Sequence, residues 1–149
     1  MALALDSAFG DVLGDNTLAI VAYALVGLVL FVVGFYVIDL ATPGHLVSVI
    51  RHERNPNATL LATAAMISVG VIVSASIYAT DAALAEGLIA TAVYGIVGIL
   101  AQVLAMLVFN LLIGLKIKDL CGEADLQPGT WMLAVTYVMI GLVTAVSVI

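Results

Sequence analysis

Four long apolar segments dominate the sequence, at about residues 17–41, 58–79, 87–113 and 131–149. A helix that crosses a bilayer needs roughly 20 mostly apolar residues, and each segment meets that requirement. Backbone groups in hydrocarbon must be satisfied within the segment, which a helix achieves, and the runs are too long for barrel strands. The sequence therefore predicts an all-α integral membrane protein with four transmembrane helices in contact with the lipid bilayer.

The composition excludes several other classes of protein. Of 149 residues, 64% are hydrophobic and 9% are charged, whereas about 25% of a soluble domain is charged. The net charge of -6, with four Lys and Arg residues, provides no basic surface for nucleic acid. The single cysteine, Cys121, cannot form a disulfide within the chain.

All four strong cations lie in two of the connecting segments. Arg51 and Arg54 lie in the loop 42–57, and Lys116 and Lys118 lie in the loop 114–130. The positive-inside rule therefore places both loops in the cytoplasm and both termini outside. The link 80–86 and the segment 1–16 are then external.

The segment 1–16 has an amphipathic pattern of its own. Leu5, Phe9, Val12 and Leu13 fall at helical spacing, opposite acidic and small polar residues. This pattern predicts an outer interfacial arm, a short helix that lies on the membrane surface.

The two halves of the chain match when one is shifted by 71 residues, without a gap. The identical pairs are Tyr23/Tyr94, Val26/Val97, Gly27/Gly98, Leu40/Leu111, Thr59/Thr130, Gly70/Gly141 and Ser76/Ser147. We therefore expect two tandem two-helix repeats, 17–79 and 87–149. Each repeat has an even number of spans, so the two are parallel and related by an axis along the membrane normal. A pseudo-two-fold bundle of this kind suits an interior site between the halves or a symmetric docking surface.

The first loop and its flanks carry a family resemblance. The chain reads Asp39-Leu40-Ala41-Thr42-Pro43, and then Asn55-Pro56-Asn57-Ala58-Thr59 at the start of the second span. These stretches, with Leu100-Ala101-Gln102-Val103-Leu104 in span three, resemble the bacterial inner-membrane proteins catalogued as domain of unknown function 350. Pro56 and the acidic N-terminal arm depart from the family pattern. The resemblance implies a four-span, often duplicated protein of the bacterial plasma membrane, and it supplies no activity.

Asp39 is the most informative polar side chain within the spans. An ionisable group at membrane depth is costly and often functional. Tyr36 lies on the same helical face and could donate a hydrogen bond to it, and Asn110 is its counterpart in the second half. One interpretation is a protonatable or cation-binding carboxylate near the symmetry axis. The other is an interfacial carboxylate that stays hydrated near the cytoplasm.

Small residues and hydroxyls mark the expected helix contacts. Gln102 lies in mid-span and is interpreted as a hydrogen-bonding contact between helices, with a substrate ligand as the alternative. The residues expected to allow close helix packing are Gly27, Gly70, Ser74, Gly95, Gly98, Ala101 and Ala105. The second span also carries several Ser and Thr residues, which could line a pathway or simply favour close packing.

The loops show no pattern typical of metal binding or catalysis. His45, His52, Glu53 and Cys121 do not match a zinc-binding spacing, so no metal or cofactor is expected. Catalysis within the membrane would need paired carboxylates or a nucleophile with a base, and Asp39 alone provides neither. We therefore do not expect an enzyme. Asn57 is predicted to cap the second span.

Two functions fit this sequence. The first is a membrane subunit that acts through helix–helix and cytoplasmic-loop contacts, as a homo-oligomer or with another membrane or cytoplasmic protein. The second is a small channel or secondary transporter for ions or small solutes that uses Asp39, Asn110 and Gln102.

Overall fold

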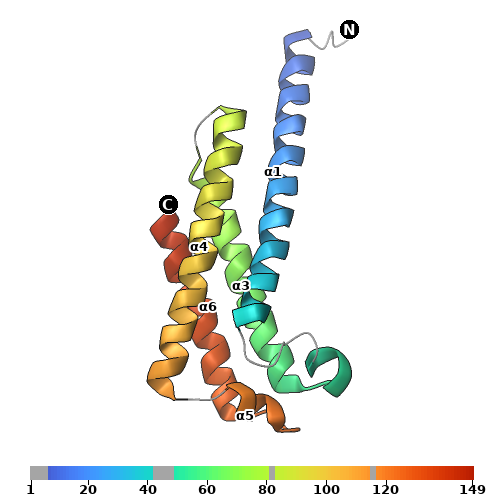
Figure 1. Cartoon of the computed structure of the whole chain (residues 1–149). Coiled ribbons are helices and arrows are strands. Elements are labelled where there is room, and N and C mark those ends of the chain that lie inside the picture. The colour runs from blue at the N-terminus through green and yellow to red at the C-terminus, as the bar shows by residue number, and fades with distance from the viewer. Residues whose placement is uncertain (1–6, 42–48, 81–82, 115–116) are drawn as a thin grey trace.

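The computed structural model describes residues 7–41, 49–80, 83–114 and 117–149, and all regular structure within these ranges is helical (Figure 1). In chain order the elements are α1 (Ser7–Ala41), the short π-helix η1 (Val49–Glu53), α3 (Pro56–Tyr78), α4 (Leu84–Ile113), α5 (Ile117–Gly122) and α6 (Pro128–Val148).

Four of these helices are long and apolar enough to cross a membrane: Asn16–Ala41 within α1, and the whole of α3, α4 and α6. This confirms the predicted number of spans. Two helices start slightly earlier than expected, at Pro56 and Pro128. Proline favours the first helical position because its fixed φ fits the helix and its missing N–H is not needed there.

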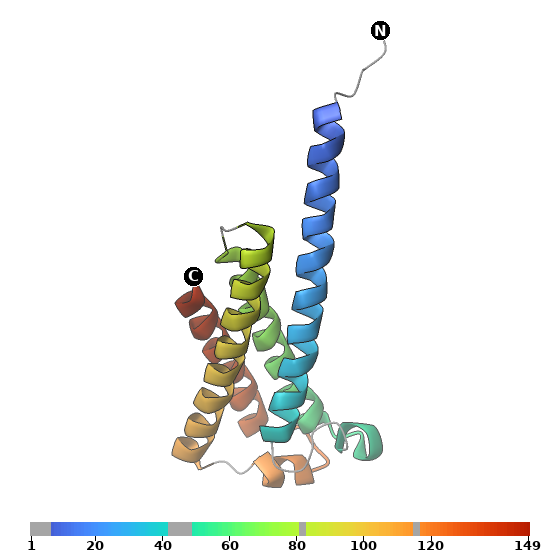
Figure 2. The ribbon, with the colours of Figure 1, turned by 45° about the horizontal axis from the view of Figure 1, so that its top comes forward.

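The expected interfacial arm is not a separate element. The first helix begins at Ser7 and continues without a break to Ala41, and residues 1–6 lie outside the described part. No proline interrupts this stretch, so the polar residues before the first span are accommodated in the same helix. Its 35 residues correspond to about 52 Å, well beyond the roughly 30 Å of hydrocarbon. Figure 2 shows the first turns of α1 extending past the start of α4.

Helix α3 lies at the centre of the bundle and α1 at its edge. α3 packs most extensively against α6 and also contacts α1 and α4. Half of its most apolar stretch is buried (50%), compared with 17% for α1. Leu61 and Val69 of α3 are buried and share one core cluster with Ile99 of α4 and Leu133 of α6, whereas the buried Ile72 shares a second cluster with Ala145 of α6.

Glycines mark the closest approaches between helices. A Cβ added to Gly95 would lie 2.6 Å from Leu30, and one added to Gly98 would lie 2.5 Å from Ile72. A Cβ on Gly141 would collide with Ser68. Two residues that were expected at such contacts do not make them, because Ser74 and Ala101 are exposed in the single chain. Both face away from the neighbouring helices, which the pattern of small residues alone could not reveal.

The two helix pairs do not pack as a pseudo-two-fold axis requires. Ser68 of α3 lies against Gly141 of α6. Under the shift of 71 residues, Ser68 corresponds to Met139 and Gly141 corresponds to Gly70. A pseudo-two-fold axis would therefore place Met139 against Gly70 in the same way. Instead, Met139 is 52% exposed, and among the described residues only Phe31 comes within 4 Å of a Cβ added to Gly70. The expected pseudo-two-fold arrangement is therefore wrong for the single chain.

The connections η1 and α5 lie at the same end of the bundle, away from the start of α1 and the end of α6 (Figure 1). Arg51 and Arg54 are exposed at that end. Lys118 belongs to α5, whereas Lys116 and His45 lie outside the described residues.

Candidate functional site

Two asparagines at the start of α3 hold a polar cluster, which we call the asparagine clamp (Asn55 and Asn57). Asn55 has an extended backbone and accepts hydrogen bonds through Oδ1 from the N–H groups of Asn57 (2.8 Å) and Ala58 (3.1 Å). Asn55 is therefore the cap of the helix, and the prediction of Asn57 as the cap is wrong. The reason is Pro56, which takes the first helical position and leaves Asn57 inside the helix.

Asn57 instead binds the segment that precedes α6. Its Nδ2 donates to the carbonyls of Glu123 (3.1 Å) and Asp125 (2.9 Å). Its Oδ1 accepts from the N–H of Gln127 (2.8 Å) and the hydroxyl of Thr130 (2.7 Å). The side chain is fully buried, and all four of its hydrogen-bonding positions are used.

The clamp fastens the two halves together at one end of the bundle. Nδ2 of Asn55 donates to the carbonyls of Cys121 (2.6 Å) and Glu123 (2.9 Å), and so reaches the same segment. Buried amides that are fully paired rigidify the structure around them. The clamp is thus a structural device that fixes the segment 121–127 against α3.

A second polar cluster lies inside the bundle, around the backbone carbonyl of Tyr137. This oxygen accepts from the Ser68 hydroxyl (2.6 Å) and from Nε2 of Gln102 (3.2 Å). Gln102 thus joins α4 to α6. Its Oε1 is buried without a hydrogen-bond partner among the described residues. A buried unpaired acceptor costs about 1–3 kcal/mol.

The phenol of Tyr137 pairs with Asn110. The two groups approach at 2.9 Å and 3.1 Å, with Asn110 Nδ2 donating to the phenol oxygen and the phenol donating to Asn110 Oδ1. A small cavity of about 10 Å³ adjoins this pair, lined also by Ile38, Ala41, Val103, Met106 and Leu107. That space is about the size of one water molecule.

Asp39 and Tyr36 are not part of this cluster. Asp39 is half-buried on α1 and does not line the cavity beside Asn110. Tyr36 is 65% exposed and packs edge-on against Phe35. Among the described residues no hydrogen bond joins Tyr36 to Asp39, so that expectation is wrong; the side chain of Tyr36 points outward from the bundle.

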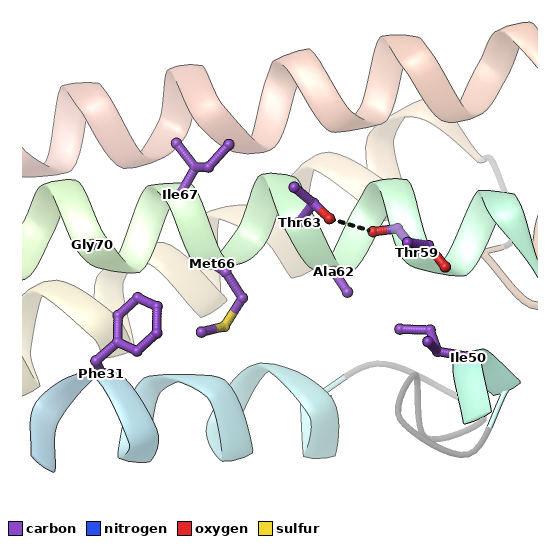
Figure 3. A pocket seen from close by; sticks show the side chains of 8 residues that line it. All are labelled: Phe31, Ile50, Thr59, Ala62, Thr63, Met66, Ile67 and Gly70. Carbon is purple, nitrogen blue, oxygen red and sulfur yellow. Dashed lines mark hydrogen bonds between the residues drawn. The ribbon is translucent and has the colours of Figure 1, made fainter. Parts of the chain in front are cut away.

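An open apolar hollow of about 470 Å³ lies between α1 and α3 (Figure 3). It is lined by Phe31, Ile50, Thr59, Ala62, Thr63, Met66, Ile67 and Gly70. The hydroxyls of Thr59 and Thr63 donate to the carbonyls of Asn55 and Thr59 in their own helix. Ser68, Ser74 and Ser76 likewise donate to carbonyls four residues earlier. The hydroxyls of this span are therefore engaged with the α3 backbone.

The sequence did offer signals for the two residues that its interpretation missed. Asn55 precedes a proline at a helix start, which is a typical cap position. Tyr137 is the only tyrosine of the fourth span, and a phenol at membrane depth needs a hydrogen-bonding partner.

These features define a four-span membrane protein with a fully paired polar clamp at one end. Residues 11–148 match the family described as Domain of Unknown Function (DUF350), and the chain belongs to that family. It is 35% identical over 133 residues to a UPF0719 transmembrane protein of Mycolicibacterium paratuberculosis, covering 89% of this chain and 88% of the relative. A UPF0719 transmembrane protein of Mycobacterium bovis is 34% identical over 132 residues, which cover 89% of this chain and 87% of that relative. No solved structure matches the chain.

Proposed function

We propose that this protein is an oligomeric or accessory subunit of the bacterial inner membrane, acting through helix–helix and cytoplasmic-loop contacts and not as an enzyme. The observation that carries the proposal is the set of small residues left uncovered in the single chain. Ser74 and Ala101 are exposed, and Gly70 borders an open hollow. In membranes such residues are typical of helix interfaces, because they let backbones approach closely.

The buried polar groups support a structural role. Among the described residues they are Asn55, Asn57, Ser68, Ser76, Thr91, Gln102 and Thr130, all of them uncharged. Groups of this kind hold helices together by hydrogen bonds and carry no charge for acid–base catalysis.

The proposal includes the orientation with both termini outside and the internal repeat. The shared position of η1 and α5 at one end supports the orientation, because both basic loops then face the cytoplasm (Figure 1). The repeat is supported by helix bounds: the shift of 71 moves α3 onto a range that matches α6 within one residue at each end.

Native mass spectrometry of the wild-type protein, extracted from bacterial membranes in a mild detergent, tests the proposal. We expect a defined homo-oligomer or a stoichiometric complex with a second protein. A monomer without a partner, both in detergent and in lipid nanodiscs, would refute the subunit role. Labelling of Lys118 and Lys116 from outside intact cells would contradict the orientation.

A channel or secondary transporter is the second candidate. The polar cluster of Ser68, Gln102, Tyr137 and Asn110 inside the bundle is the observation that favours it. Ion flux into proteoliposomes tests it with wild type, Asp39→Asn and Gln102→Leu. Flux above that of empty vesicles, reduced by either substitution, would support transport. Leakage equal to that of empty vesicles for all three proteins would eliminate it.

A further inference from the structure

The covered face of α6 corresponds to an open face of α3. α6 presents Thr130, Ala134, Tyr137 and Gly141 to the interior, and all four are buried. Under the shift of 71 residues they fall on Thr59, Thr63, Met66 and Gly70 of α3, which line the hollow between α1 and α3 (Figure 3). We call these four residues the hollow face of α3.

The reverse correspondence also holds. α3 directs Ala64, Ser68 and Ile72 into the core beside α6, and all three are buried. Under the same shift they fall on Val135, Met139 and Val143 of α6, which are 58%, 52% and 64% exposed. We call these three residues the outer face of α6. Within the chain, one face of α3 packs against one face of α6. The corresponding face on the other helix stays open in each case.

The outer pair of helices repeats this pattern. Leu30 of α1 meets Gly95 of α4, and a Cβ on Gly34 would lie 3.3 Å from Ile99. Under the shift of 71 residues, Gly34 corresponds to Ala105 of α4, and Ile99 corresponds to Leu28 of α1. Leu28 is 59% exposed, and Ala105 is half-buried.

The packing within each half supports the shift of 71 residues. A Cβ on Gly27 would lie 3.5 Å from Ile77, and one on Gly98 would lie 3.8 Å from Val148. These two contacts occupy corresponding positions in the first and second halves. The helix pairs α1–α3 and α4–α6 therefore pack internally in the same register. The two pairs differ in the faces through which they contact each other.

We infer that a second copy of this chain covers the hollow face with the outer face of its α6, so that copies assemble head to tail into a closed ring. This inference rests on the proposed subunit function and specifies its partner. The interface is heterologous, since it joins two different faces, and all copies share one orientation in the membrane. Such an interface closes into a ring around the membrane normal or continues without end.

The chemistry of the two faces fits a second copy. Within the chain Ser68 lies on Gly141, and between copies Met139 would lie on Gly70 in the same way. Methionine is longer than serine, and the hollow of about 470 Å³ beside Gly70 provides the space. Both faces are uncharged. Ser74 lies one helical turn beyond Gly70 on α3, and Ala101 lies one turn before Ala105 on α4; both are exposed in one chain and would be covered.

Disulfide cross-linking in membranes tests the ring, in a Cys121→Ser background. The pair Gly70→Cys with Met139→Cys is expected to give a ladder of covalent species that ends at the ring size. A Cβ at position 70 would lie 3.6 Å from Phe31, an ordinary contact, so the variant should fold. Each single variant should give no covalent dimer, and a mixture of the two single variants should give dimers only. A second pair, Leu28→Cys with Ala105→Cys, should also give a ladder.

The matched control combines Gly70→Cys with Leu104→Cys, because Leu104 is 64% exposed and does not lie on the outer face of α6. This pair should give no ladder. Dimers from a single variant would show a two-fold interface and overturn the inference. No ladder from either pair, while native mass spectrometry shows a wild-type homo-oligomer, would overturn the ring and leave the subunit role. One wild-type copy in complex with a second protein would overturn the ring and leave the subunit role, and a monomer without a partner would overturn both.

Discussion

Gly70 and Gly141 occupy matching positions in the two halves, but their surroundings differ. Gly141 lies directly against Ser68, whereas Gly70 borders an open hollow with Phe31 as its nearest neighbour. The difference arises because the two hairpins meet through non-equivalent faces. The proposed internal repeat would thus supply two copies of a contact surface, of which the packing of one chain covers only one.

The largest expected effect comes from Gly141→Ala. The new methyl group would lie within 2.7 Å of Ser68 Cα, so the α3–α6 contact must open. Overpacking usually costs about 1–3 kcal/mol, and because the backbone of Ser68 must move here we expect a loss above about 3 kcal/mol. Gly70→Ala is the matched control and should not destabilise the protein, because the methyl group has space beside Phe31 and alanine favours the helix by up to about 1 kcal/mol. Thermal unfolding in detergent measures both, and equal shifts would contradict the comparison.

Asn57→Ala should have the next largest effect. It removes four hydrogen bonds to the second half, whereas position 128, its counterpart, is a proline. Water can replace some partners at this end of the bundle, so we expect a loss of about 2–3 kcal/mol. Amide hydrogen exchange should rise in the segment 121–127. The exposed Asn16→Ala serves as the control, and a similarly small effect of both variants would show that the clamp contributes little.

Tyr137→Phe should cost about 1 kcal/mol, because it leaves the Asn110 amide without the phenol. Its counterpart in the first half is Met66, which makes no such bond. Asn110→Leu and the double variant complete a double-mutant cycle in detergent, and the two changes should be strongly non-additive. Tyr78→Phe, at a 77% exposed position, is the control. Additive effects would show that the pair does not interact.

The smallest expected effect is that of Gln102→Met, at the position that corresponds to Phe31. The substitution removes one 3.2 Å hydrogen bond and also the unpaired Oε1. The two changes offset each other, so stability should change by less than about 0.5 kcal/mol. A loss above about 2 kcal/mol in the purified protein would mean that this oxygen has a partner, such as a bound molecule or a second chain.

The number and position of the spans could be predicted because each follows from local sequence. Length and hydrophobicity identify a span without reference to its neighbours. The helix starts at Pro56 and Pro128 were less well predicted, since both lie before the expected starts at 58 and 131. The choice between Asn55 and Asn57 as the cap was harder. It depends on the segment 121–127, which is more than 60 residues away and binds both side chains.

The buried faces could not be predicted, for a physical reason. The spans are apolar all round, so hydrophobicity does not separate a lipid-facing side from a core-facing side. Small residues such as Ser74 and Ala101 allow close packing on any face, and they do not indicate which helix will pack against them. Gln102 was an exception, because a polar side chain in mid-span must find a partner across a helix contact.

The asparagine clamp has a consequence for biosynthesis. Six of the eight hydrogen bonds made by its two side chains reach residues 121–130. At about 5–20 residues per second, the ribosome needs roughly 4–15 s after Asn57 to produce Thr130. During that interval the first hairpin enters the membrane with most of its clamp partners still unmade. The amide groups of Asn55 and Asn57 must therefore bind water or the insertion machinery until the segment before the last helix has been made.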